Sequence, residues 1–166
     1  MLDVWTFLQR TAGEGFIAAR EDGRLLGYAI FVPSLRAIQR RAFFSGEAFK
    51  WALHAVSGRY DLRPGRLLRG LQNKVFFLFQ GQRFRTRGDA QLLNIAVDPD
   101  VQGRGIAKRL VDAGLSAMRA LNVPEVRLEV RPSNRSAIAL YRKTGWREVG
   151  RTRDLEGEWI VMLTTP

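Results

Sequence analysis

The feature that most constrains this chain is an apolar run that ends at a proline and continues through two glycines into a long helical pattern. Residues 92–97 are Leu-Leu-Asn-Ile-Ala-Val, and these branched apolar side chains predict a buried strand. The strand is expected to end at Asp98 and Pro99, because proline cannot continue a sheet ladder. The glycine turn that follows (residues 102–107, Gln-Gly-Arg-Gly-Ile-Ala) leaves unpaired backbone N–H groups beside the positive end of a helix dipole. Such a turn predicts a site for a phosphate or pyrophosphate group.

The rest of the sequence alternates between strand and helix patterns. Asp22 and Gly23 predict a tight turn between strands 16–20 and 25–32, and Pro33 is expected to end the second strand. The elements expected before residue 90 are the end of a helix at 2–10, this hairpin, helices at 34–44 (N-capped by Ser34), 47–56 and 66–76, and a basic loop at 81–88. Those expected afterwards are strand 92–97, helix 104–121, strand 126–130, a helix through Ala137, Ile138 and Tyr141 that stops at Gly145, and a closing hairpin of 146–152 and 159–163.

The composition predicts one folded domain. A chain of 166 residues that is 46% hydrophobic can bury a proper core. It contains no run of eighteen apolar residues, and its first residues do not form a secretory signal pattern. The absence of cysteine excludes disulfides, thiolate metal sites and a cysteine nucleophile. His54 is the only histidine, so no multi-histidine metal site is expected, and we interpret it as a packing or surface residue. We therefore expect a cytoplasmic protein without a bound metal.

The net charge of +11 is concentrated in one segment. Residues 34–88 hold 12 Lys or Arg and 2 Asp or Glu, whereas the other residues hold 15 basic and 14 acidic side chains. A basic segment favours an acidic partner, such as nucleic acid, an anionic lipid, or an anionic substrate or cofactor. The alternative is a solvated surface that keeps the protein soluble.

Two common phosphate-binding loops do not fit the glycine turn. The nucleoside-triphosphate loop needs two glycines separated by four residues and followed by Lys and Ser or Thr, which Gly105 and the residues after it do not supply. The dinucleotide fingerprint needs a third glycine where this chain has Lys108.

A third loop does fit, and with it the chain resembles the GCN5-related N-acetyltransferases, the GNAT family. Gln102, Gly105 and Ala107 match the family's pyrophosphate-binding motif. Residues 128–146 resemble the family's second motif, which has a strand, an Asn, an Ala, a Leu-Tyr pair, and a Gly followed by an aromatic residue. The resemblance covers residues 89–163 well and 16–32 moderately.

The resemblance implies an α/β (α+β) fold of the acyl-CoA acyltransferase type. Its mixed central sheet splays between two central parallel strands, and residues 34–88 form a helical insert before the fourth family strand. We expect a single domain over residues 1–166, without the first strand and helix that normally begin the family. The sequence leaves a homodimer open.

The resemblance also implies acetyl-CoA as the acetyl donor. The pantetheine arm is expected on the backbone of Ile95, Ala96 and Val97. The pyrophosphate is expected on the turn and the helix start, which comprise Gln102, Gly103, Arg104, Gly105, Ile106, Ala107 and Lys108. Asn134 is expected to bond the pantetheine arm or to steady the tyrosine, Ala137 to lie beside the cofactor, and Tyr141 to face the thioester sulfur.

Acetyl transfer to an amine needs a base, a donor to the thioester oxygen and a proton for the leaving thiolate. Glu129 is the candidate base; alternatively it is a polar strand residue or a partner of Arg127 or Arg131. Tyr141 is the candidate acid; alternatively it is a core tyrosine. The backbone N–H of Val97 is the candidate oxyanion donor. Without cysteine, we favour direct transfer in a ternary complex over an acyl-enzyme.

The sequence therefore predicts an acyltransferase that moves an acetyl group from acetyl-CoA to a primary amine. Two alternatives remain. The first is a non-catalytic module on the same fold that binds acyl-CoA or an acidic partner, and the second is a basic nucleic-acid-binding protein. The residues do not identify the acceptor.

Overall fold

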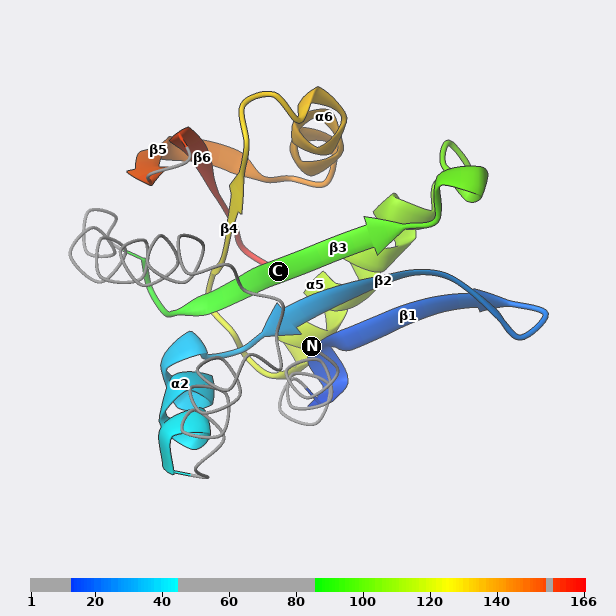
Figure 1. The fold of residues 1–166 in the computed structure, drawn as a ribbon. Helices are drawn as coiled ribbons and strands as arrows, with labels where there is room; N and C mark the ends of the chain where they lie inside the picture. Colours follow the sequence, from blue (N-terminus) through cyan, green and yellow to red (C-terminus); the bar gives the residue numbers. More distant parts are fainter. Residues whose placement is uncertain (1–12, 45–85, 155–156) are drawn as a thin grey trace, which may run out of the picture.

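A computed structural model describes residues 13–44, 86–154 and 157–166 of the chain (Figure 1). These residues form a mixed sheet of six strands in the order β1-β2-β3-β4-β6-β5, together with three α-helices and two short 3₁₀ helices. The elements are η1 (Gly13–Gly15), β1 (Phe16–Glu21), β2 (Arg24–Val32), α2 (Leu35–Phe44), β3 (Ala90–Val97), η2 (Pro99–Val101), α5 (Ile106–Ala120), β4 (Val126–Val130), α6 (Arg135–Lys143), β5 (Arg147–Asp154) and β6 (Gly157–Thr164).

Local signals in the sequence set the ends of most elements. Asp22 (φ 49°) and Gly23 (φ 79°) make the left-handed turn that joins β1 to β2, as the sequence predicts. Ser34 caps α2 as expected, since its Oγ accepts from the backbone N–H of Ala37 at 3.1 Å. Gly145 lies just past the end of α6 with φ 87°, which confirms it as the stop signal. The expected helices at 2–10, 47–56 and 66–76, and most of the 81–88 loop, lie outside the described residues.

Helix α5 begins two residues later than the sequence predicts. Gly103 (φ 80°) and Gly105 (φ 75°) are both left-handed, and Gly105 is the N-cap. The helical conformation therefore starts at Ile106, because the turn keeps its glycines in a conformation that a right-handed helix does not use. Strand β3 in turn begins two residues earlier than expected, at Ala90, where it pairs with β4.

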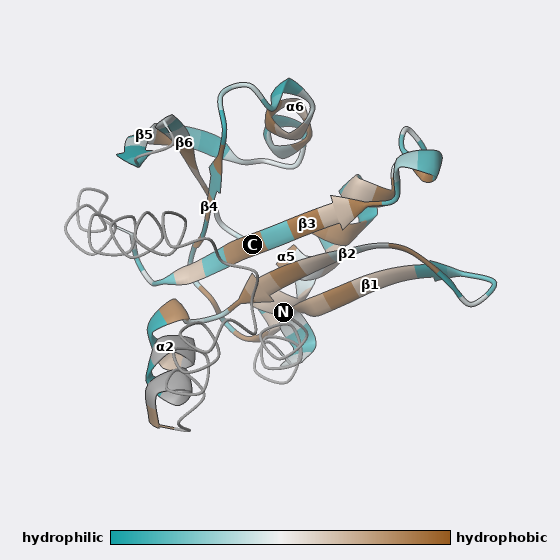
Figure 2. Cartoon of the chain, viewed as in Figure 1, coloured by the Kyte–Doolittle hydropathy of each residue, from teal (hydrophilic) through white to brown (hydrophobic). Residues whose placement is uncertain are grey.

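The main core lies between the sheet and helices α5 and α6. Phe31 of β2 is fully buried there, and its ring packs so closely against Gly114 that a Cβ on this glycine would lie 2.0 Å from Phe31 Cε2. Figure 2 shows hydrophobic residues along β2, and hydrophilic ones at the β1–β2 turn. A smaller cluster around Ile30 and Val32 lies next to α2. Within the residues that the structure describes, no helix is long and apolar enough to cross a membrane.

Strands β3 and β4 separate soon after they meet. They are parallel and pair only at Ala90–Val126 and Gln91–Arg127, although β4 pairs along its whole length with β6. The pairing of β3 with β2 skips Leu93, which identifies a bulge where the two central strands part. A bulge bends and twists its strand, so β3 turns away from β4 and a gap opens between them (Figure 1). The splayed mixed sheet that the sequence predicts is therefore present.

Candidate active site

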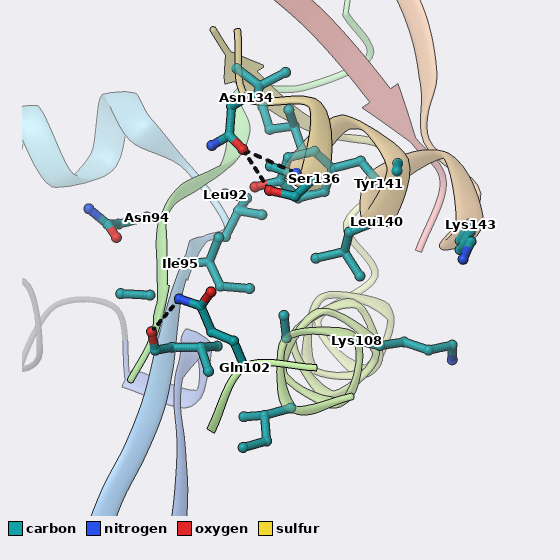
Figure 3. A pocket seen from close by; sticks show the side chains of 18 of the residues that line it. Leu92, Asn94, Ile95, Gln102, Lys108, Asn134, Ser136, Leu140, Tyr141 and Lys143 are labelled. Atoms are coloured by element: carbon teal, nitrogen blue, oxygen red, sulfur yellow. Dashed lines mark hydrogen bonds between the residues drawn. The ribbon is translucent and has the colours of Figure 1, made fainter. Parts of the chain in front are cut away.

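A cavity of about 730 Å³ lies in the gap between β3 and β4 (Figure 3). It is lined by β3, the glycine turn, the start of α5, β4 and α6. Of the site residues that the sequence predicts, the cavity brings together Ile95, Ala96, Val97, Gln102, Gly103, Gly105, Ile106, Ala107, Lys108, Glu129, Asn134, Ala137 and Tyr141. Arg104 is the exception, since it does not line the cavity.

The free edge of β3 offers backbone groups to this cavity. The N–H of Asp98 donates to Leu26 O at 2.9 Å, so the backbone of residue 98 faces β2. Because successive residues of a strand turn their backbone groups to opposite edges, Val97 and Ile95 face the gap. The amide of Gln102 approaches Val97 O at 3.5 Å from that side. Among the described residues, β3 has no strand partner on this edge beyond Gln91, and such an edge can bind an extended amide chain.

The glycine turn presents its backbone to the cavity. Gly103 and Gly105 have positive φ, and within the described part of the chain a Cβ on either would have no atom within 4 Å. Glycine is therefore required here by backbone conformation rather than by crowding. Gly105 caps α5 without a side-chain hydrogen bond, which leaves the N–H groups of the first helical turn to an anion.

Asn134 is the N-cap of α6. Its side-chain oxygen accepts from the backbone N–H of Ala137 at 3.2 Å and from Ser136 Oγ at 3.1 Å (Figure 3). These bonds occupy the oxygen and fix the side chain at the rim of the cavity, where its amide nitrogen can donate to a ligand.

Tyr141 lies on α6 and is only 5% exposed. Its ring is tilted against Trp146, with the ring centroids 5.8 Å apart. Burial raises the pKa of the phenol to about 12. The hydroxyl is therefore protonated at neutral pH and can act as a hydrogen-bond donor.

Glu129 lies on β4 with a side chain that is 10% exposed, and it forms an ion pair and a hydrogen bond with Arg127. Burial raises the pKa of the carboxyl, while the positive charge of Arg127 opposes this and the negative charge of Asp154 adds to it. The sequence offered two interpretations of Glu129, a base and a partner of Arg127. The structure shows the pairing, and the raised pKa is a property that a base near neutral pH also needs.

A second charged group beside Glu129 was not expected from the sequence. Both oxygens of Asp154 lie 3.3 Å from the guanidinium of Arg131, and the carboxylate accepts from Trp159 Nε1 at 2.8 Å. The Arg131 guanidinium stacks over the Trp159 ring at 3.7 Å. Arg131 and Trp159 line the same cavity as Glu129, so this group fixes the wall beside the candidate base. Alternation along β4 places residues 129 and 131 on one face, but nothing local indicates the partners on β5 and β6.

Comparison with known proteins identifies the family. The sequence profile described as "Acetyltransferase (GNAT) family" matches residues 1–146. The chain belongs to this family. Relatives in the GNAT family include the mycothiol acetyltransferase of Saccharomonospora viridis, 35% identical over 118 residues, which are 71% of this chain and 36% of the relative. The [ribosomal protein bS18]-alanine N-acetyltransferase of Salmonella typhimurium is 45% identical over 60 residues, which are 36% of this chain and 40% of the relative.

Solved GNAT structures share the fold at low sequence identity. The yncA acetyltransferase of Salmonella typhimurium, whose structure includes its cofactor acetyl-CoA, aligns with a TM-score of 0.57 at 15% identity and covers 98% of this chain and 70% of that one. The chain matches less than half the length of the two curated relatives above. GNAT proteins use acetyl-CoA.

Proposed function

We propose that this protein transfers an acetyl group from acetyl-CoA to a primary amine, directly within a ternary complex. The observation that carries this proposal is the convergence of an unpaired strand edge, a glycine turn at a helix start and the buried Tyr141 on one cavity. Each suits a different part of an acyl-CoA: an extended amide chain, a pyrophosphate and a thioester.

The residues fit this donor. The edge of β3 at Ile95 and Val97 would pair with the amides of the pantetheine arm, and the N–H groups of residues 103–108 would hold the pyrophosphate. The amide nitrogen of Asn134 would donate to the arm. When bound, acetyl-CoA supplies an activated acetyl group on a thioester; the protein supplies position, a proton acceptor and hydrogen-bond donors.

Glu129 would accept the proton of the acceptor ammonium, directly or through water. An alkyl ammonium has a pKa of about 10.4 and no free electron pair, so it must lose this proton before it can attack. Burial raises the pKa of the Glu129 carboxyl, which strengthens it as a base, while the positive charge of Arg127 opposes this rise. The ion pair between Glu129 and Arg127 must weaken when the carboxylate takes up the proton, because the carboxylate then loses its negative charge.

Tyr141 would donate to the leaving sulfur, and the N–H of Val97 to the thioester oxygen. With a pKa of about 12, the phenol keeps its proton through the physiological range and stabilises negative charge on sulfur by hydrogen bonding. Full proton transfer to a thiolate, whose pKa is about 8.5, is unfavourable from such a phenol. Solvent would then complete the protonation.

The test is thiol release from acetyl-CoA over a panel of amines, followed with a thiol reagent. Because the relatives are named as a mycothiol acetyltransferase and a [ribosomal protein bS18]-alanine N-acetyltransferase, the panel includes a peptide that begins with alanine, a lysine peptide, aminosugars and small alkyl amines. We expect amine-dependent thiol release that is strongly reduced in Glu129→Gln. Thiol release that does not depend on any amine would refute acetyl transfer to an amine.

A non-catalytic acyl-CoA-binding module is the second candidate. It is favoured by the Glu129–Arg127 ion pair, which gives the carboxylate a structural role without any chemistry. This candidate predicts binding of acetyl-CoA with no thiol release across the panel. An acidic partner for the basic segment 34–88, and a homodimer, remain proposals to be tested by salt-dependent binding and by sedimentation; the segment lies mostly outside the described residues.

A further inference from the structure

The side chain of Arg104 points out of the cavity, although its neighbours in the glycine turn line it. Gly103 and Gly105 both border the cavity, whereas Arg104 does not. Its Nη2 instead lies 2.9 Å from Oε1 and 3.1 Å from Oε2 of Glu21, the last residue of β1. The positive charge of the turn is therefore directed at the β1–β2 hairpin and away from the ligand.

Further ion pairs connect the β1–β2 hairpin to the residues just before the glycine turn, with the positive charge now on the hairpin. Arg24, the first residue of β2, lies 2.6 Å from Asp98 Oδ2 and 3.2 Å from Asp100 Oδ2, in the segment between β3 and the glycine turn. Asp98 is also fixed from within, because its Oδ1 accepts from the backbone N–H of Asp100 at 3.0 Å. We call these five residues, Glu21, Arg24, Asp98, Asp100 and Arg104, the hairpin brace.

The two glycines of the turn have no side chains that could fix its shape. Gly103 and Gly105 are left-handed, a Cβ on either would meet no atom of the described residues within 4 Å, and glycine has the largest backbone freedom to lose on ordering. A turn that is already ordered binds an anion more tightly, because less ordering remains to be done on binding. Arg24 also offsets part of the negative charge of Asp98 and Asp100, two carboxylates that would otherwise repel a phosphate near the turn.

Resting on the proposed function, we infer that Glu21 and Arg24 are positioning residues for the pyrophosphate of the donor. They act through Asp98, Asp100 and Arg104, and Arg104 serves the donor by the position of its backbone rather than through its guanidinium. A direct guanidinium–phosphate contact is the competing arrangement, and the two arrangements predict opposite effects of removing Glu21.

The experiment is isothermal titration of CoA into the wild type, Glu21→Gln, Arg24→Gln and Arg104→Gln. The brace predicts that each substitution weakens CoA binding by about two- to five-fold, the range of an exposed ion pair. The charge-swapped double variant Glu21→Arg with Arg104→Glu is expected to restore the Kd to within about two-fold of wild type, a rescue that a direct guanidinium–phosphate contact would not give. Glu148→Gln is the matched control, since Glu148 is a surface carboxylate that pairs with Arg142 and Arg151 and does not line the cavity. The Kd of this variant for CoA should equal that of the wild type.

Each outcome has a definite meaning. If Glu21→Gln binds CoA as tightly as the wild type or more tightly, or if the swapped variant binds far more weakly than Arg104→Gln, the guanidinium contacts the phosphate and the brace is refuted. Thermal melting of each variant without ligand shows whether a change in Kd reflects loss of fold; weakened binding with an unchanged Tm supports the brace, and weakened binding that follows the fall in Tm overturns it. A wild type that does not bind CoA refutes the proposed function itself.

Discussion

Replacing Tyr141 with Phe removes one hydroxyl from the cavity and keeps the ring. The ring is 5% exposed and packs against Trp146, and a phenylalanine would retain both the burial and this contact. The substitution therefore isolates the hydroxyl, with little expected change in the free energy of unfolding at neutral pH.

The expected loss of turnover follows from the pKa of the phenol. A pKa of about 12 exceeds that of an alkyl thiol, about 8.5, by roughly 3.5 units, so complete proton transfer to the leaving thiolate costs about 5 kcal/mol. The hydroxyl thus acts as a hydrogen-bond donor to a charged group, an interaction of about 1.5–3 kcal/mol. Its removal should lower kcat by about 10- to 150-fold, because each 1.36 kcal/mol is a factor of ten.

The assay is steady-state thiol release at saturating acceptor, with KM for acetyl-CoA measured in parallel and the Kd for CoA by titration. We expect kcat to fall while the Kd changes by less than about two-fold, because the charge on sulfur exists only in the transition state. An unchanged kcat would refute the role of the hydroxyl. Equal losses in kcat and affinity would count against this role, because they would show that the hydroxyl does not act on the transition state alone.

Three further substitutions or conditions give separate checks. In the wild type, the rate should fall at low pH with an apparent pKa above that of an ordinary glutamate, because burial raises the pKa of the Glu129 carboxyl. Glu129→Gln should abolish this fall. A variant that keeps the same fall at the same pH would refute Glu129 as the base. Gly114→Ala places a Cβ 2.0 Å from the Phe31 ring. The overpacking cost of about 1–3 kcal/mol exceeds the helix-propensity gain of about 1 kcal/mol, so the variant should melt at a lower Tm. An equal or higher Tm would contradict the close packing of Phe31 on Gly114. The free energy of unfolding should fall between about pH 10 and pH 12, because Tyr141 ionises near pH 10 in the unfolded chain but keeps its proton to about pH 12 in the folded protein. Urea denaturation should show that this fall is larger in the wild type than in Tyr141→Phe, by up to about 3 kcal/mol. Equal pH dependence of the two proteins would contradict the raised pKa.

The elements that the sequence predicts well are those with local signals. The Asp22-Gly23 turn, the Ser34 cap and the glycine after α6 depend on backbone conformations that few residues adopt, so the residue type reveals the structure. The same holds for the glycine turn, whose pattern at the end of β3 located the cavity. The expected burial of that strand was wrong, since of residues 92–97 only Leu92 is buried where β3 borders the gap. The error of two residues at the start of α5 arose because apolar spacing cannot show where left-handed glycines end.

The contacts that the sequence could not predict join residues far apart in the chain. Arg24 and Asp98 are separated by 74 positions, and the pairing depends on the β1–β2 hairpin lying next to the glycine turn in space. The partner of Glu129 was ambiguous because Arg127 and Arg131 both flank it on one face of β4; the structure pairs Arg127 with Glu129 and Arg131 with Asp154. Spacing along one strand cannot decide between such partners, because the choice depends on β5 and β6.

The central claim is that the gap between β3 and β4 holds acetyl-CoA, and isothermal titration of acetyl-CoA into the intact protein tests it most directly. The account predicts one-to-one binding with a Kd below millimolar, weakened in Gly105→Ala because alanine disfavours the left-handed φ of 75°. No detectable heat at millimolar acetyl-CoA, or binding that Gly105→Ala leaves unchanged, would contradict it.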